Sequence, residues 1–202
     1  MPRLLLSLIF AAAFAGAAAA QGTAQPKQAV ATFAGGCFWC VESDFDHVKG
    51  VLSTTSGYTG GHVAKPTYHQ VSAGGTGHAE SVEIVYDPSK VTYAQLLDHF
   101  WHTVDPTVKD RQFCDVGHQY RTAIFVHNDE QRKLAEASKK KVEAELKVPI
   151  YTEIVAAGPF YKAEEYHQDY YKKSPVQYKF YRWNCGRDQR IKQIWGAHKG
   201  DS

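Results

Sequence analysis

The segment Gly35-Gly36-Cys37 constrains the fold of this chain most, because it joins an expected strand to an expected helix. Residues 28–35 form a short apolar and β-branched run that is typical of a buried strand, and residues 38–48 indicate the helix that follows. Cys37 is therefore expected at a strand-to-helix turn. Backbone N–H groups and the helix dipole favour a thiolate there. We predict that Cys37 has a lowered pKa and acts as a nucleophile near neutral pH.

The rest of the chain alternates strands and helices without the regular repeat of a doubly wound sheet. Further strands are expected at 51–58, 82–86, 120–127 and 152–156, helices at 93–104, 130–147, 163–172 and 187–195, and a polar loop at 105–117. No internal repeat or linker interrupts this order. The pattern favours one domain with an α+β fold, a two-layer sandwich with a mixed sheet.

The first 20 residues have the layout of a cleaved signal peptide. Arg3 is their only charge, an apolar stretch follows it, and Ala18 and Ala20 fit the rule for small residues at the cleavage site. The alternative is an anchor helix, but this stretch is short and rich in alanine. We expect a signal peptide at 1–20, an extension at 21–29 and a catalytic domain at 30–202. The protein is then exported, periplasmic or secreted, and not stably inserted in a membrane.

The charge balance and the cysteines narrow the classes of function. The chain has 23 basic and 21 acidic residues, which argues against a nucleic-acid partner. Four cysteines are too few for a disulfide-held miniprotein. Cys37 and Cys40 are spaced as in a thioredoxin-like redox motif, although the elements around them differ. They could also be two buried core thiols. A zinc site would need a second ligand pair, and the pattern predicts no metal.

Several motifs occur in the order in which A-type peptide methionine sulfoxide reductases carry them. They are Gly-Cys-Phe-Trp at 36–39, Gly-Tyr-Thr-Gly-Gly at 57–61, Pro-Thr-Tyr at 66–68, Thr-Gly-His-Ala-Glu at 76–80, Asp-Pro-Thr at 105–107, Gln-Tyr-Arg at 119–121 and Cys-Gly-Arg at 185–187. Nearly all of residues 30–196 resembles this family. The resemblance implies the family's ferredoxin-like core and the thiol-dependent reduction of methionine S-sulfoxide, free or in proteins, as a repair of oxidised proteins.

The resemblance also implies roles for individual residues. Cys37 would attack the sulfoxide sulfur, and Glu80 would protonate the oxygen, for which its carboxyl group must be neutral at working pH. Hydrogen bonds from Tyr68 and Tyr120 would hold that oxygen. The substrate-binding residues would be an apolar wall and a carboxylate near the substrate backbone: Phe38, Trp39 and Asp115.

A second thiol must then turn the sulfenic acid on Cys37 into a disulfide. The candidates for this resolving cysteine are Cys40 first, Cys185 second and Cys114 close behind. No cofactor is implied except an external dithiol such as thioredoxin or a thioredoxin-like protein. We expect a monomer whose partners are its substrate and this reductant.

Two other functions are open on sequence alone. The Cys37 and Cys40 pair could exchange disulfides in other proteins, or the aromatic residues could bind methionine-containing peptides without turnover. Neither alternative requires an acid and two phenols that converge on one oxygen. The presence of Glu80, Tyr68 and Tyr120 therefore favours sulfoxide reduction.

Overall fold

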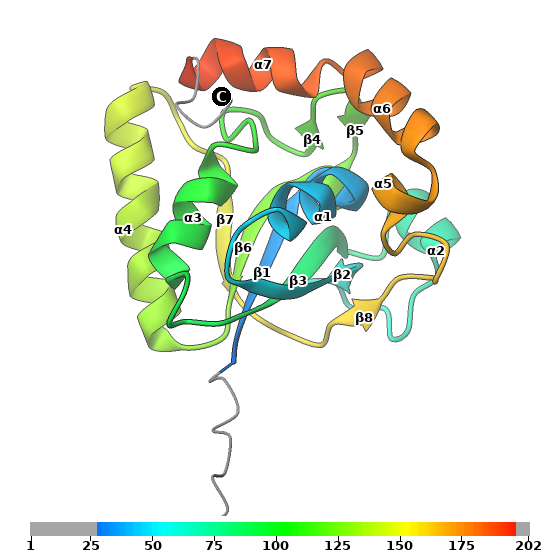
Figure 1. The fold of residues 1–202 in the computed structure, drawn as a ribbon, viewed down its shortest axis with the longest axis horizontal. Helices are drawn as coiled ribbons and strands as arrows, with labels where there is room; N and C mark the ends of the chain where they lie inside the picture. The colour runs from blue at the N-terminus through cyan, green and yellow to red at the C-terminus, as the bar shows by residue number, and fades with distance from the viewer. Residues whose placement is uncertain (1–27, 197–202) are drawn as a thin grey trace, which may run out of the picture.

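A six-stranded mixed sheet organises the protein, as the computed structural model shows for residues 28–196 (Figure 1). The strands lie in the order β7-β6-β1-β3-β2-β8. Their bounds are β1 Ala29–Gly35, β2 Val51–Thr59, β3 Ala79–Tyr86, β6 Thr122–Val126, β7 Glu153–Ala156 and β8 Tyr161–Lys162. β6 and β7 run parallel, and the other neighbouring strands run antiparallel. The expected α+β fold with a mixed sheet is confirmed, and the expected signal peptide lies outside the described residues.

Three helices cover the face of the sheet that holds the main core. They are α1 Phe38–Asp46, α3 Tyr93–Trp101 and α4 Asp129–Leu146. Phe33 of β1 lies at the centre of this layer, and its ring stacks on Phe45 of α1 at 5.3 Å and on Phe100 of α3 at 4.9 Å between ring centres. This packing fixes α1 on the sheet, and with it the turn that carries Cys37.

The remaining elements complete the fold, with α7 along the top of the view and α6 beside it (Figure 1). They are α2 Tyr68–Ser72, the ribbon of β4 Arg111–Gln112 and β5 Asp115–Val116, the 3-10 turn η1 His118–Tyr120, α5 Tyr170–Lys173, α6 Pro175–Asn184 and α7 Arg187–Trp195. Most of them carry few buried apolar side chains. Their positions therefore depend on hydrogen bonds and on one disulfide, Cys114–Cys185, more than on an apolar core.

The expected helix at 163–172 is wrong, because most of this segment forms turns and only Tyr170–Lys173 is helical. Tertiary hydrogen bonds outweigh its helical pattern. The Gln168 side chain bonds both backbone groups of Ser56 in β2, and the Glu164 carboxylate accepts from the Tyr58 hydroxyl. The expected loop at 105–117 also contains the β4 and β5 ribbon, and the pattern did not predict α2 or α6.

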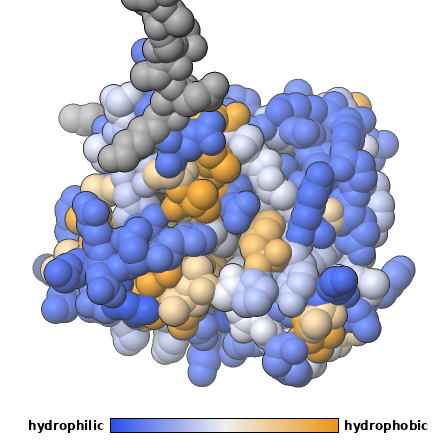
Figure 2. Space-filling model, turned by 90° about the horizontal axis from the view of Figure 1, so that it is seen from below, coloured by the Kyte–Doolittle hydropathy of each residue, from blue (hydrophilic) through white to orange (hydrophobic). Residues whose placement is uncertain are grey.

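Hydrophilic residues cover most of the face in Figure 2, and hydrophobic residues appear on it in small separate areas. The lysine-rich helix α4 is exposed along one side, as its charges predict. Within residues 28–196, no helix combines the length and the apolar character needed to cross a lipid bilayer.

Gly36 offers a test of the turn before Cys37. Its φ is +84°, and a Cβ at this position would lie 2.5 Å from the Cβ of Gln112. Gly36→Ala should therefore lower the free energy of unfolding by about 1–3 kcal/mol, measured by urea denaturation. The matched control is Gly74→Ala, because Gly74 has the same φ of +84° with no atom within 4 Å of the added Cβ. Equal losses in the two variants would contradict a close approach at Gly36.

Candidate active site

Cys37 lies directly before α1, at the end of β1. It is the N-cap residue of the helix, and its carbonyl accepts from the N–H of Cys40 at 3.1 Å. The Cys37 side chain makes no capping hydrogen bond. Cys37 is 7% exposed and Cys40 1% exposed, and both are free thiols. The turn thus places two buried thiols together, one of them at the edge of a cavity.

Glu80 of β3 occupies the position that a capping side chain would take. Its Oε2 accepts a hydrogen bond from the backbone N–H of Phe38, the first residue of α1, at 3.0 Å. The side chain is only 2% exposed. Burial raises the pKa of Glu80 to about 8, although the Phe38 N–H favours the charged form. Glu80 is therefore mostly protonated at neutral pH, as its expected role as an acid requires.

A small cavity brings the predicted site residues together. Its lining consists of Cys37, Phe38, Trp39, Tyr68, Glu80, Asp115, Tyr120 and Tyr181. All seven residues predicted to be catalytic or substrate-binding are in this set. Segments from across the chain thus converge where α1 begins.

The two phenols expected to hold the substrate oxygen have raised pKa values. Burial raises the pKa of Tyr68 to about 12 and that of Tyr120 further, and the nearby Glu80 adds to both shifts. Both hydroxyls therefore remain protonated, and able to donate, throughout the neutral range. The backbone N–H of Tyr68 donates to Glu164 at 2.8 Å, which fixes the start of α2 beside the cavity.

Trp39 is held in a fixed orientation by groups of the C-terminal segment. Its indole N–H donates to His167 Nδ1 at 3.0 Å, and its ring stacks on Tyr170 with 3.8 Å between ring centres. The Tyr181 ring meets the same indole edge-on at 5.7 Å. This arrangement forms a rigid aromatic wall of the kind that receives a small apolar group such as a methyl thioether.

The expected lowering of the Cys37 pKa is not found. Burial raises the pKa of the Cys37 thiol, and nearby Cys40 and Glu80 raise it further. The pKa of Cys40 is lowered, because Cys37 donates a hydrogen bond to its sulfur and because Arg187 and Arg182 are positively charged. The helix dipole alone does not outweigh burial here, where the Glu80 carboxyl group accepts the hydrogen bond of the first N–H of α1. The resting pair favours a negative charge on Cys40.

The other two cysteines form a disulfide, Cys114–Cys185. Of the three candidates for the resolving cysteine, Cys40 is thus the one that lies beside Cys37 with a free thiol. The Cys114 and Cys185 sulfurs and a carboxylate oxygen of Asp115 lie within 4.8 Å of one another. Because metals bind cysteine as a thiolate, the disulfide form of this cluster is not a metal site.

Sequence reasoning missed Tyr181. Its hydroxyl donates to Asp115, and its interaction with Cys37 lowers the pKa of that thiol. Its position depends on α6, which the sequence pattern did not predict. Tyr181 stands four residues before Cys185. This spacing was the one feature of the sequence that could have placed Tyr181 near a cysteine.

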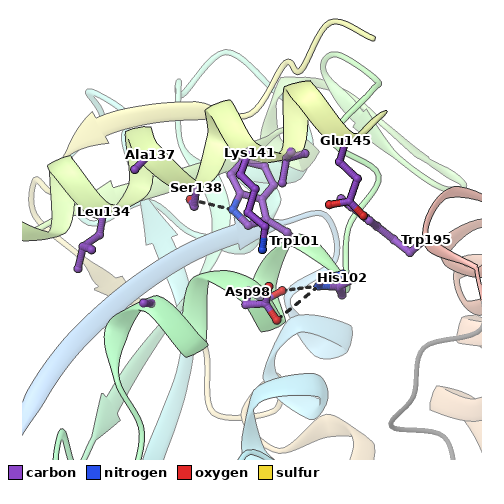
Figure 3. A pocket seen from close by; sticks show the side chains of 11 residues that line it. Asp98, Trp101, His102, Leu134, Ala137, Ser138, Lys141, Glu145 and Trp195 are labelled. Carbon is purple, nitrogen blue, oxygen red and sulfur yellow. Dashed lines mark hydrogen bonds and ion pairs between the residues drawn. The ribbon is translucent and has the colours of Figure 1, made fainter. Parts of the chain in front are cut away.

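A larger cavity lies between α3 and α4, away from these residues (Figure 3). Trp101, Leu134 and Trp195 contribute to its mainly apolar lining, and the Trp101 indole N–H donates to Ser138 at 2.9 Å. The residues that line it include no cysteine. The chemistry of the chain is therefore assigned to the smaller cavity at Cys37.

Comparisons with known proteins identify relatives along almost the whole chain. The family profile described as peptide methionine sulfoxide reductase matches residues 29–199. A peptide methionine sulfoxide reductase MsrA of Bacillus licheniformis is 54% identical over 172 residues, which cover 84% of this chain and 95% of the relative. Many other curated relatives carry the same description.

Solved structures with similar folds were also found. Reduced Mxr1 of Saccharomyces cerevisiae is similar with a TM-score of 0.71 and 33% identity, covering 74% of this chain and 87% of that one. The structure of the same yeast protein in complex with Trx2 gives a TM-score of 0.53 at 25% identity, covering 71% and 85% of the two chains.

The raised pKa of Glu80 predicts a pH-dependent stability. An unfolded glutamate has a pKa near 4.5, so the stabilisation from the buried neutral form is complete below about pH 4.5 and is lost as the pH rises through about 8. Glu80→Gln keeps a neutral side chain at every pH. Calorimetry should show the Tm of the parent falling relative to the variant between pH 5 and 9, and parallel curves would contradict a raised pKa.

Proposed function

Because the chain belongs to the peptide methionine sulfoxide reductase family and is a peptide-methionine (S)-S-oxide reductase, we propose that Cys37 is its nucleophile and Glu80 its acid. The observation that carries this assignment is their common position at one helix start. Glu80 bonds the N–H of Phe38, the residue next to Cys37, and both side chains line the same cavity. An acid and a thiol are thereby presented to one substrate group.

The reaction needs a proton on the sulfoxide oxygen, since the sulfur is otherwise a poor electrophile. The Cys37 thiolate attacks, Glu80 gives its proton to the oxygen, and Tyr68 and Tyr120 donate hydrogen bonds to it. The products are methionine, a sulfenic acid on Cys37 and the Glu80 carboxylate. The substrate sulfur gains two electrons, which the Cys37 sulfur loses. Phe38 and Trp39 face the methyl group, and Asp115 lies beside the substrate backbone.

Cys40 supplies the base that the raised pKa of Cys37 requires. Cys37 donates its proton to the Cys40 thiolate, which Arg187 and Arg182 stabilise, and becomes reactive as it does so. The Cys40 thiol then attacks the sulfenic acid, and a Cys37–Cys40 disulfide forms with release of water. Cys40 is therefore proposed as the resolving cysteine ahead of Cys185 and Cys114, which are already bonded to each other.

An external dithiol must reduce the Cys37–Cys40 disulfide for a second turnover. A yeast relative has been solved in complex with Trx2, which supports a thioredoxin-like protein as this reductant. The other two proposed functions fit less well. Neither disulfide exchange nor passive peptide binding needs a buried neutral carboxyl group beside two protonated phenols.

Export is proposed from the layout of residues 1–20, and the Cys114–Cys185 disulfide supports it. Disulfides persist in oxidising compartments such as the periplasm and the external medium. We also propose that the working form is a monomer.

Mass spectrometry tests the assignment of Cys40. After enzyme with free Cys37 and Cys40 receives one equivalent of methionine S-sulfoxide, the chain should lose two hydrogens and peptide mapping should find Cys37 joined to Cys40. Cys40→Ser should instead gain one oxygen, as the sulfenic acid. The control is Cys114→Ser/Cys185→Ser, which should still form the Cys37–Cys40 link. A bond from Cys37 to Cys114 or Cys185 in the parent protein would overturn the assignment.

Kinetics test the acid. Glu80→Gln should lower kcat by about 10²- to 10⁴-fold with little change in KM, because the proton is transferred in the transition state. In the parent enzyme kcat should fall as the pH rises through about 8, where Glu80 ionises, and the variant should lack this decline. Rates are measured with S and R epimers of a methionine sulfoxide substrate. An effect confined to KM would refute the role.

A further inference from the structure

Tyr181 and Asp115 form one wall of the Cys37 cavity although they lie far apart in the sequence. Tyr181 projects from α6 and Asp115 from β5, and the Tyr181 hydroxyl donates to the Asp115 carboxylate. Both side chains line the same cavity as Cys37. Whatever fixes α6 against β5 therefore fixes this wall.

The Cys114–Cys185 disulfide joins these two elements next to both side chains. Cys114 directly precedes Asp115. Cys185 ends α6, where its N–H donates to the carbonyl of Tyr181 at 2.9 Å. The covalent link is thus one residue from Asp115 and one helical turn from Tyr181. It closes a loop of 71 residues between the two segments.

Few apolar side chains hold this wall, and its other contacts are mainly polar. Arg182 of α6 pairs with Asp44 of α1 at 2.7 Å, and the Gln112 side chain of β4 bonds both backbone groups of Asp105. Tyr178 is the one buried residue of α6, whereas Phe180 is 63% and Trp183 75% exposed. The β4 and β5 strands contain two residues each, and so short a ribbon has little stability of its own. Elements with few buried apolar contacts open locally at low cost in free energy. The disulfide is the covalent part of the constraint on this side of the cavity, and it joins α6 directly to the segment that carries Asp115.

The Tyr181 hydroxyl is suited to stabilise the attacking sulfur. It has a single proton, which it donates to Asp115 in the resting site. The hydroxyl can rotate about its C–O bond and turn this proton toward Cys37, whose pKa an interaction with Tyr181 lowers. The chain of groups from Asp115 through Tyr181 then ends at the Cys37 thiolate.

We propose that the Cys114–Cys185 disulfide is a positioning element of the reduction, which holds Tyr181 and Asp115 so that the Tyr181 hydroxyl hydrogen-bonds the Cys37 sulfur as it attacks. This inference rests on the proposed role of Cys37 as the nucleophile. It gives Cys114 and Cys185 a task apart from resolution of the sulfenic acid. Tyr181 touches the reacting sulfur, and the two cysteines act through it.

A double-mutant cycle tests the proposal in a single turnover without added reductant. The variants are Tyr181→Phe, Cys114→Ser/Cys185→Ser and their combination, each with Cys37 and Cys40 reduced. In the parent, thiol labelling and mass spectrometry verify that the Cys114–Cys185 bond is intact. Loss of the disulfide should slow sulfoxide reduction by about 10-fold or more, since small misplacements at a reacting centre have effects of this size. Tyr181→Phe should slow it similarly.

The combined variant should be slowed no further than Tyr181→Phe alone, because the disulfide acts through the tyrosine. Both single changes should also move the rising limb of the pH–rate profile, which reports ionisation of the nucleophile, to higher pH, a shift that a general loss of stability would not produce. The control is Tyr171→Phe, whose hydroxyl also donates to a carboxylate, Asp46 at 2.6 Å, but outside the cavity. Its single-turnover rate should equal that of the parent.

A disulfide-free variant with the parent's rate and pH profile would overturn the proposal, as would additive effects in the cycle. If that variant does not fold, as judged by circular dichroism, Tyr181→Phe alone decides by its pH profile, and an unshifted limb overturns the proposal. Cys37→Ser separates this inference from the function on which it rests. Sulfoxide reduction that survives Cys37→Ser would refute the nucleophile itself, whereas its loss leaves the cycle to decide the role of the disulfide.

Discussion

The hydrogen bond from the Phe38 N–H to Glu80 determines the relation between the proposed nucleophile, Cys37, and the proposed acid. β1 and β3 are neighbouring antiparallel strands, so the last residues of β1 lie beside the first residues of β3. The sheet thereby brings Glu80 to the first turn of α1. The carboxyl group takes the place of a helix cap, and Cys37 is left free to face the cavity. The same hydrogen bond thus satisfies the first N–H of α1 and positions the Glu80 carboxyl group near Cys37.

Burial of this contact has opposite consequences for the two reacting groups. The reaction needs Glu80 neutral, and loss of water raises its pKa in the required direction. The reaction needs Cys37 charged, and the same loss of water opposes that. The proposed mechanism meets this conflict with a second thiol. The pKa of Cys40 is lowered by its hydrogen bond from Cys37 and by Arg187 and Arg182, so Cys40 is the more readily ionised of the pair.

Short-range patterns in the sequence predicted the elements that carry the site, and long-range contacts account for what was missed. The helices α3 and α4 and the glycine turn before Cys37 follow from local sequence patterns, and each was predicted. The segment at 163–172 has a helical pattern but is held by bonds to β2 and α2. No local signal reports such partners. The pairing of Cys114 with Cys185 and the position of Tyr181 also depend on long-range contacts, so local patterns could not predict them.

The four cysteines divide into two pairs by their surroundings, and this division follows from what each pair does. Cys37 and Cys40 lie at the N-terminal end of α1, which packs on the sheet in the main core, and Cys37 lines one small cavity. In the proposed mechanism, a sulfenic acid formed on Cys37 meets Cys40 before any external thiol. Cys114 and Cys185 lie where the chain has little apolar packing and where a covalent bond constrains most. The apolar core therefore holds Cys37 in place. The Cys114–Cys185 disulfide constrains the wall formed by Tyr181 and Asp115, where apolar packing is sparse.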